Sequence, residues 1–251
     1  MAVYTKLNGK ELRDFFSKYN LGKFLNYKEI KEGIENTNYF ILTEKGKYIL
    51  TLYEKRIDEK ELPFFISLMR NLYDKNFPSP EPIINKNGNY ISEISNKKAA
   101  VVSFVDGEAK KFLNPNECYQ VGINTGKLHF ITKNLSGKRE NKLSINSWRK
   151  IYNKVKKDCH KIHPKLTEII EKNLDEIEKN WPKNIPQGII HADLFPDNIF
   201  FKNNKLSGII DFYFSCSDFY AFEIAICLNA LCFDGAKENL SFNVTKAKKF
   251  V

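Results

Sequence analysis

The residues HADLFPDNIFF, at positions 191–201, place charged and turn-forming side chains between two apolar runs. The preceding GII and the following IFF have the composition of short buried strands, whereas Asp, Pro and Asn favour turns. We therefore expect a tight loop between two strands, with Asp193 and Asn198 five positions apart on it. Another acid, Asp211, ends a later apolar run, thirteen residues after Asn198. Because Asp and Asn are also ordinary turn residues, the loop alone does not decide between a surface turn and an active site.

The segments before this loop indicate a β-rich half that ends near residue 105. Alternating apolar residues bounded by turn formers predict strands, and apolar residues at helical spacing predict helices. The expected elements are a helix over 10–20, a hairpin over 39–53 that turns at Lys45-Gly46, a helix over 58–73 with Glu61 placed for a capping box, and a hairpin with a buried strand over 82–105.

The residues from 106 onward indicate a larger, mainly helical half. Gly122 and Gly126 stand four apart in one expected helix, which indicates close packing against a neighbour. The expected elements are helices over 116–131 and 220–233, a pair of charged helices over 145–181 broken at Pro164, and two short strands with a loop over 188–214. The fold class is therefore α+β, with lobes of residues 1–105 and 106–251 and a cleft between them.

Composition narrows the class of protein. A chain of 251 residues with 42% hydrophobic residues can bury a large core. The formal charge of +10 comes from scattered lysines, which is typical of a solvated surface and argues against nucleic-acid binding. The five cysteines form no CxxC pair, no secretory leader is seen, and no apolar run approaches the roughly 18–20 residues of a membrane span. These features favour a soluble cytoplasmic protein with reduced thiols.

The chemistry that best uses the spacing of the polar loop is phosphoryl transfer to an alcohol. Positions 191–198 match four residues of the protein-kinase catalytic loop H-R-D-L-x-x-x-N, with Ala192 in place of the arginine. Phosphoryl transfer needs a carboxylate beside the attacking hydroxyl and hard oxygen ligands for magnesium. Asp193 fits the first role, and Asn198 with Asp211 fits the second. An ordinary Asp has a low pKa, so Asp193 would accept the proton late, as charge develops.

Longer segments resemble the aminoglycoside-phosphotransferase and choline-kinase superfamily, and within it the kinase-like homoserine kinase family. The resemblance rests on GIENTNYF (33–40), ELPFFISLM (61–69), HADLFPDNIFF (191–201), IIDFYFSCSDFYAFEIAICLNALCF (209–233) and SFNVTK (241–246). It implies a protein-kinase-like fold and the use of ATP and Mg²⁺ to phosphorylate the side-chain hydroxyl of L-homoserine, a step toward threonine. Because relatives continue for several more helices, we also expect this chain to be truncated at its C-terminus.

The resemblance implies roles for individual residues. Asp193 is implied as the catalytic base, and Asn198 and Asp211 as magnesium ligands. The implied nucleotide contacts are Gly33, Asn36, Thr37, Asn38 and Thr51, and the residues implied to support the loop, or to bind the substrate ammonium, are His191, Asp218 and Glu223. Thr51 stands where relatives carry a phosphate-binding lysine, so Lys47, Lys55 or a hydroxyl takes that role. Glu61 is then either a helix cap or a partner of the phosphate grip.

Other interpretations stay open at this point. The enzyme could act on another amino alcohol, such as choline or an aminoglycoside. Thr51 also fits a nucleotide-binding pseudokinase, although such a protein has no use for Asp193, Asn198 and Asp211 together. The cation for a substrate carboxylate is left open among Arg139, Arg149 and several lysines. The set Cys159, His160 and His163 is read as a solvated helix face in preference to a metal site.

Overall fold

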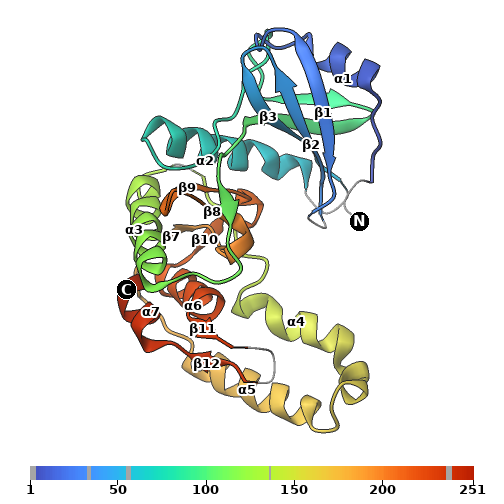
Figure 1. Ribbon diagram of the computed structural model, residues 1–251. Helices are drawn as coiled ribbons and strands as arrows, with labels where there is room; N and C mark the ends of the chain where they lie inside the picture. Colours follow the sequence, from blue (N-terminus) through green and yellow to red (C-terminus); the bar gives the residue numbers. More distant parts are fainter. Residues whose placement is uncertain (1–3, 33–34, 55–57, 136, 236–238) are drawn as a thin grey trace.

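The structure, a computed structural model, describes residues 4–32, 35–54, 58–135, 137–235 and 239–251. Its first half holds a β-sheet, and its second half holds longer helices around short strands (Figure 1). The elements of the first half are α1 (Gly9–Phe16), β1 (Phe24–Ile30), β2 (Thr37–Thr43), β3 (Gly46–Leu52), the 3₁₀ turn η1 (Glu59–Glu61), α2 (Leu62–Asp74), β4 (Ile91–Ile94) and β5 (Lys97–Ser103).

Within the described residues, the first half forms a five-stranded antiparallel sheet in the order β1-β2-β3-β5-β4. The expected hairpin over 39–53 is confirmed as β2 and β3. Thr43 pairs with Gly46, so the turn is Glu44-Lys45, one residue earlier than expected. The later hairpin forms between β4 and β5, where Ser95 and Asn96 both adopt positive φ. A two-residue turn needs that conformation to match the twist of its strands.

The two faces of this sheet pack against different helices. Ala99 and Val101 of β5 point to the side covered by α1, whereas Ala100 and Val102 point to the side covered by α2. This alternation is the period-2 pattern of a strand that is buried on both faces. The α2 side of the sheet shares one hydrophobic core with the helices of the second half, so the two halves are joined by packing as well as by the chain.

The second half is built around α3 and α6, which flank short strands (Figure 1). Its elements are β6 (Glu108–Ala109), α3 (Pro115–Thr132), α4 (Ile145–Val155), η2 (Lys156–Lys161), α5 (Leu166–Asn180), β7 (Gln187–Ile190), η3 (Pro196–Asn198), β8 (Ile199–Lys202), β9 (Lys205–Ile209), η4 (Phe212–Phe214), β10 (Cys216–Phe219), α6 (Tyr220–Leu231), β11 (Phe233–Asp234), β12 (Ser241–Phe242) and α7 (Val244–Phe250). The expected helices are confirmed. The segment 188–214 holds more than the two expected strands, because β7 pairs with β10 while β8 pairs with β6 and β9.

The two glycines of α3 lie in different surroundings. A Cβ on Gly122 would lie 1.9 Å from the carbonyl oxygen of Phe250, so α7 packs directly on the backbone of α3 at this point. A Cβ on Gly126 would meet nothing within 4 Å. The expectation of close packing is therefore confirmed for Gly122 and wrong for Gly126.

Three further observations concern the chain as a whole. In the part of the chain that the structure describes, no helix is both long enough and apolar enough to cross a membrane. All five cysteines are buried free thiols. The described ranges also contain no group of three or more His, Cys, Asp or Glu side chains arranged to hold a metal ion.

Candidate active site

The loop after β7 is held from behind by a buried carboxylate. Glu223, on α6, is completely buried, and its two oxygens accept the backbone N–H groups of His191 and Ala192. Hydrogen bonds to an ionised acceptor are stronger than neutral ones, so they fix the backbone where the strand ends and the loop begins. Glu223 does not line the cavity in front of the loop. Its surroundings fit a loop-supporting residue better than a group that binds a substrate ammonium.

His191 connects the loop to the segment that carries Asp211. The Asp193 N–H donates to His191 Nδ1 at 3.2 Å, so Nε2 carries the proton and donates to the carbonyl oxygen of Ile210 at 3.0 Å. Burial lowers the pKa of His191, because it disfavours the charged imidazolium. A neutral histidine with both ring nitrogens bonded to backbone positions the loop and leaves no nitrogen for a reactant.

Asn198 fixes the side chain of Asp193. Its Nδ2 donates to the backbone oxygen and to Oδ2 of Asp193, both at 2.8 Å. Because both N–H groups are used, the amide oxygen is the Asn198 atom that remains for a ligand. Burial raises the pKa of Asp193 to about 7, and the nearby charge of Asp211 adds to the effect, against the opposing hydrogen bond from Asn198.

Asp211 lies beside the loop at the end of β9. The Ile210 N–H donates to the Asn198 carbonyl at 3.0 Å, which places the two segments side by side. Asp211 is exposed to solvent at its surface, although protein atoms crowd around its carboxylate. This burial raises the pKa of Asp211 to about 6, and the charge of Glu35 adds to the shift.

Two of these residues have a strained backbone. Ala192 and Asp211 both have φ of 64°, in the left-handed region that non-glycine residues rarely adopt. Such a conformation costs about 1–2 kcal/mol and persists only where the surroundings enforce it, which is typical of functional sites. Here the hydrogen bond from the Ala192 N–H to Glu223 supplies part of that enforcement.

The segment expected to cover the phosphates is only partly described. Gly33 lies outside the described residues. Thr37 is fully buried, and its hydroxyl donates to Glu54 at 2.9 Å. Asn36 is also buried, and its side-chain oxygen accepts the Glu54 N–H. These two side chains face the protein, so their expected contacts with a nucleotide stay a prediction.

Thr51, which the resemblance places where relatives carry a phosphate-binding lysine, lies on β3. Its hydroxyl donates to the Asn38 side-chain oxygen at 2.8 Å, which ties β3 to β2. Of the lysines considered for its role, Lys47 lies 3.7 Å from Asp106 at the connection between the halves, and Lys55 lies outside the described residues. The expected role of Thr51 or of a nearby lysine in phosphate binding stays a prediction.

A cavity of about 520 Å³ opens in front of Asp193. One wall comes from the loop and from α6, with Phe222 and Ile226. The other lining residues include Glu61, at the start of α2, and Arg139 and Lys142, on the segment 137–144 between α3 and α4. The cavity therefore joins a carboxylate of raised pKa to a set of charged side chains from both halves of the chain.

Glu61 has a role that neither expectation described. Its carboxylate lies 3.1 Å from Arg139 Nε and 2.7 Å from Lys142 Nζ. Burial alone would raise the pKa of Glu61, but the hydrogen bonds from Lys142 and Arg139 outweigh it and lower the pKa. The capping box is wrong, because Asp58 caps the turn η1 while the Glu61 side chain points to the other half.

The sequence offered Arg139 as a candidate cation, but it did not reveal that the segment 137–144 lines the cavity. This segment lies between two helices, has no periodic pattern and carries no motif, so only its basic residues distinguish it. It is fastened to β10, because the backbone carbonyl of Arg139 accepts the Ser217 N–H at 2.7 Å and the Asn141 side-chain amide donates to Asp218 at 2.7 Å. Asp218 thus supports a residue of the cavity wall and does not line the cavity itself.

Comparison with known proteins assigns this arrangement to a family. A profile described as the phosphotransferase enzyme family matches residues 26–240. The chain belongs to this family. Homoserine kinase of Beijerinckia indica is 42% identical over 250 residues, which cover 100% of this chain and 77% of that protein. Homoserine kinase of Bartonella henselae is 44% identical over 253 residues, which cover 99% of this chain and 77% of that protein.

Solved structures of the same kind share the fold of this phosphotransferase. Spectinomycin phosphotransferase in complex with ADP and spectinomycin matches with a TM-score of 0.73 at 14% identity, over 98% of this chain and 79% of that chain. Amicoumacin kinase in complex with AMP-PNP matches with a TM-score of 0.67 at 15% identity, over 89% of this chain and 69% of that chain. The expected two-lobed, kinase-like α+β fold is confirmed.

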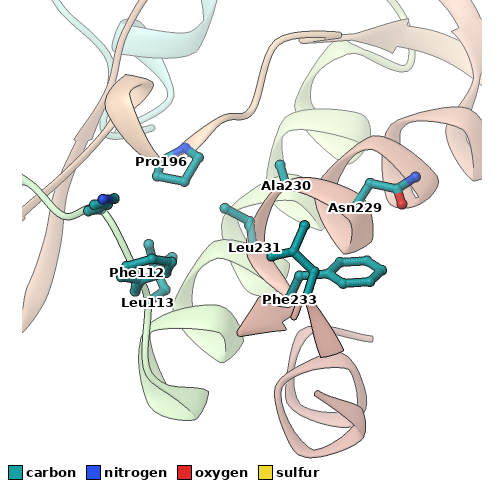
Figure 2. A pocket seen from close by; sticks show the side chains of 9 residues that line it. Phe112, Leu113, Pro196, Asn229, Ala230, Leu231 and Phe233 are labelled. Carbon is teal, nitrogen blue, oxygen red and sulfur yellow. The ribbon is translucent and has the colours of Figure 1, made fainter. Parts of the chain in front are cut away.

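The phosphotransferase has another cavity, of about 370 Å³, on the far side of the loop. Figure 2 shows Pro196 on one side of it and, on another, Ala230 and Leu231 at the end of α6 with Phe233 of β11. Its lining is mainly apolar and includes none of Asp193, Asn198 or Asp211. The cavity in front of Asp193 is therefore the candidate active site.

Proposed function

We propose that this phosphotransferase transfers the γ-phosphoryl group of ATP to the side-chain hydroxyl of L-homoserine, giving O-phospho-L-homoserine and ADP. The observation that carries the proposal is Asp193, which Asn198 holds at the mouth of a charged cavity. The relatives at 42–44% identity that are named homoserine kinase support the choice of acceptor. The expected division into lobes 1–105 and 106–251, and a cytoplasmic location, are part of the same proposal.

Asp193 is the catalytic residue in this proposal. The substrate hydroxyl donates to the Asp193 carboxylate, and its proton moves there as the oxygen forms a bond to the γ-phosphorus and the bond to the ADP oxygen breaks. A carboxylate whose pKa is raised to about 7 accepts that proton more readily than an ordinary aspartate. Asn198 keeps the carboxylate oriented, and Glu223 and His191 hold the backbone beneath it.

The donor atoms beside Asp193 fit a magnesium ion. Magnesium prefers hard oxygen ligands, and the structure offers the Asp211 carboxylate and the amide oxygen of Asn198. Burial and the charge of Glu35 raise the pKa of Asp211, so a positive ion beside it would favour its charged form. Bound there with ATP, the ion would neutralise charge on the transferring phosphoryl group.

The test is a coupled assay of ADP release with purified protein, ATP and Mg²⁺. L-homoserine is compared with choline, ethanolamine and spectinomycin as acceptors. We expect homoserine to give the highest kcat/KM, and Asp193→Ala to reduce kcat by about 10²–10⁴-fold, which is the range for loss of a general base. Faster turnover of choline or spectinomycin would refute the choice of acceptor. ADP release that Asp193→Ala leaves intact would refute the assigned base.

Thr51 at the lysine position motivates one competing proposal, a nucleotide-binding pseudokinase. Such a protein would bind ATP and release no ADP with any acceptor of the panel. Turnover that depends on both the acceptor and Asp193 would exclude it.

A further inference from the structure

In the proposed reaction the acceptor lies in the cavity in front of Asp193, because Asp193 takes the proton of its hydroxyl. None of residues 103–107, which connect the two halves, lines it, whereas α6 and the segment 137–144 do. Its volume of about 520 Å³ exceeds the needs of a small amino acid, so water can share the space. The charged groups that line the cavity then determine the orientation of a bound acceptor.

The two cations that line the cavity from the segment 137–144 are not equivalent. Arg139 is only 15% exposed, stacks over the Phe65 ring at 4.9 Å, and donates to the Ser215 carbonyl at 3.1 Å while contacting Glu61. It is committed to holding the two halves together. Lys142 is 62% exposed and lies 2.7 Å from Glu61 Oε1. The Lys142 ammonium can therefore turn toward a ligand without leaving a buried polar group unpaired.

The second cationic candidate from the sequence is excluded by its position. Arg149 lies on α4, where it pairs with Asp175 and Glu178 on α5 at 2.7 Å. It does not line the cavity. The cation that faces the acceptor is therefore to be sought on the segment 137–144.

We propose that Lys142 and Glu61 form the recognition site for the zwitterionic end of an α-amino acid. Lys142 binds the carboxylate, Glu61 binds the ammonium, and Arg139 holds Glu61 in place. The proposal rests on the proposed kinase function and specifies the acceptor as an amino acid. The substrate exchanges one existing ion pair for two, so no charge is left unpaired on the cavity wall. An acceptor without a carboxylate cannot make this exchange, because its ammonium would meet Lys142 uncompensated.

Two truncated acceptors separate the ends of the substrate. 3-Aminopropan-1-ol is homoserine without its carboxylate, and 4-hydroxybutyrate is homoserine without its ammonium. We expect Lys142→Met to lower the ratio of kcat/KM for homoserine to that for 3-aminopropan-1-ol by about tenfold or more, the effect of one charged hydrogen bond. We expect Glu61→Gln to lower the ratio for homoserine over 4-hydroxybutyrate by a similar factor. Thermal melting checks that each variant is folded.

Lys138→Met is the matched control, because Lys138 is exposed on the same segment and does not line the cavity. It should leave both ratios unchanged. The inference is overturned if Lys142→Met behaves as Lys138→Met does, or if it reduces turnover of homoserine and of 3-aminopropan-1-ol equally. Glu35 is the other carboxylate of the first half that lines the cavity. The inference is also overturned if Glu35→Gln lowers the ratio of kcat/KM for homoserine over 4-hydroxybutyrate and Glu61→Gln does not.

Calorimetric titration of L-homoserine into the protein with Mg²⁺ and a non-hydrolysable ATP analogue separates this inference from the proposed function. Binding that Lys142→Met weakens about tenfold, without any turnover by the unmodified protein, would support the recognition site and refute the kinase activity. Turnover of homoserine that Lys142→Met and Glu61→Gln leave unchanged would support the kinase activity and refute the recognition site. Absence of binding by the unmodified protein would overturn the recognition site.

Discussion

Replacing the two glycines of α3 by alanine should change stability in opposite directions. The chemical change is the same, and both positions lie inside one helix, so the intrinsic gain in helix propensity is about 1 kcal/mol at each. At Gly126 nothing lies within 4 Å of the new Cβ, so this gain is retained. At Gly122 the Cβ would lie 1.9 Å from the carbonyl oxygen and 2.8 Å from the carbonyl carbon of Phe250.

The cost at Gly122 follows from what blocks the new methyl group. The obstacle is backbone, which cannot rotate aside, so α7 must move about 1.5 Å to restore an ordinary 3.4 Å contact. Phe250 is buried in the shared core, and its displacement loosens that packing. Overpacking of this kind costs about 1–3 kcal/mol, and loss of the Phe250 packing raises the cost toward the upper end of that range. After the propensity gain, Gly122→Ala should lose about 1–2 kcal/mol.

Thermal melting followed by circular dichroism measures both effects. For a chain of this size 1 kcal/mol corresponds to about 2–4 °C, so Gly126→Ala should melt about 2–4 °C higher and Gly122→Ala about 2–8 °C lower than the unmodified protein. Hydrogen exchange should show loss of protection in α7 for Gly122→Ala alone. If Gly122→Ala melts as high as Gly126→Ala, α7 does not pack on α3 as described, and the argument fails.

Three further predictions test the charges of the site. Asp193→Asn should stabilise the ligand-free protein, because a carboxyl whose pKa is raised in the folded state destabilises that state once it ionises. The gain should be absent near pH 4, grow as pH rises, and be complete above pH 7. Its upper limit is about 4 kcal/mol, which solvent screening reduces. The prediction is contradicted if the difference in melting temperature between Asp193→Asn and the unmodified protein is the same at pH 4 and pH 8. Asp211→Asn should raise the Mg²⁺ concentration for half-maximal ADP release by about tenfold or more, and an unchanged requirement would remove Asp211 from the metal site. Arg149→Ala should change the free energy of unfolding by less than about 1 kcal/mol and leave the KM for homoserine unchanged, because its ion pairs are at the surface; a raised KM would reopen the choice of carboxylate partner.

The elements that the sequence predicted well are those whose pattern is local. The hairpin of β2 and β3, the helices α3 and α6, and the pair α4 and α5 follow from periodicity and turn residues over a few positions. The spacing of Asp193, Asn198 and Asp211 likewise sufficed to expect them together, because one loop and the hairpin of β8 and β9 connect them. Such features need no knowledge of distant parts of the chain.

The parts that the sequence did not predict depend on contacts between distant segments. Glu61 is placed for a capping box by its spacing from Asp58, but Arg139 and Lys142, about eighty positions later, attract its side chain instead. Gly122 and Gly126 look alike in sequence, and only the position of α7 distinguishes them. In both cases the outcome depends on a tertiary contact that the local pattern does not contain.

The proton affinity of Asp193 shows the same dependence on distant contacts at the level of chemistry. The sequence names an aspartate, whose ordinary pKa makes it a weak base, and a net charge of +10 that would favour its ionised form. In the fold the lysines are scattered, while burial and the charges of Asp211, Asp197 and Glu35 raise the pKa of Asp193 to about 7. The local field therefore opposes the field expected from the overall charge. Asn198 limits this shift while fixing the carboxylate, so the same contact sets both the strength of the base and its orientation.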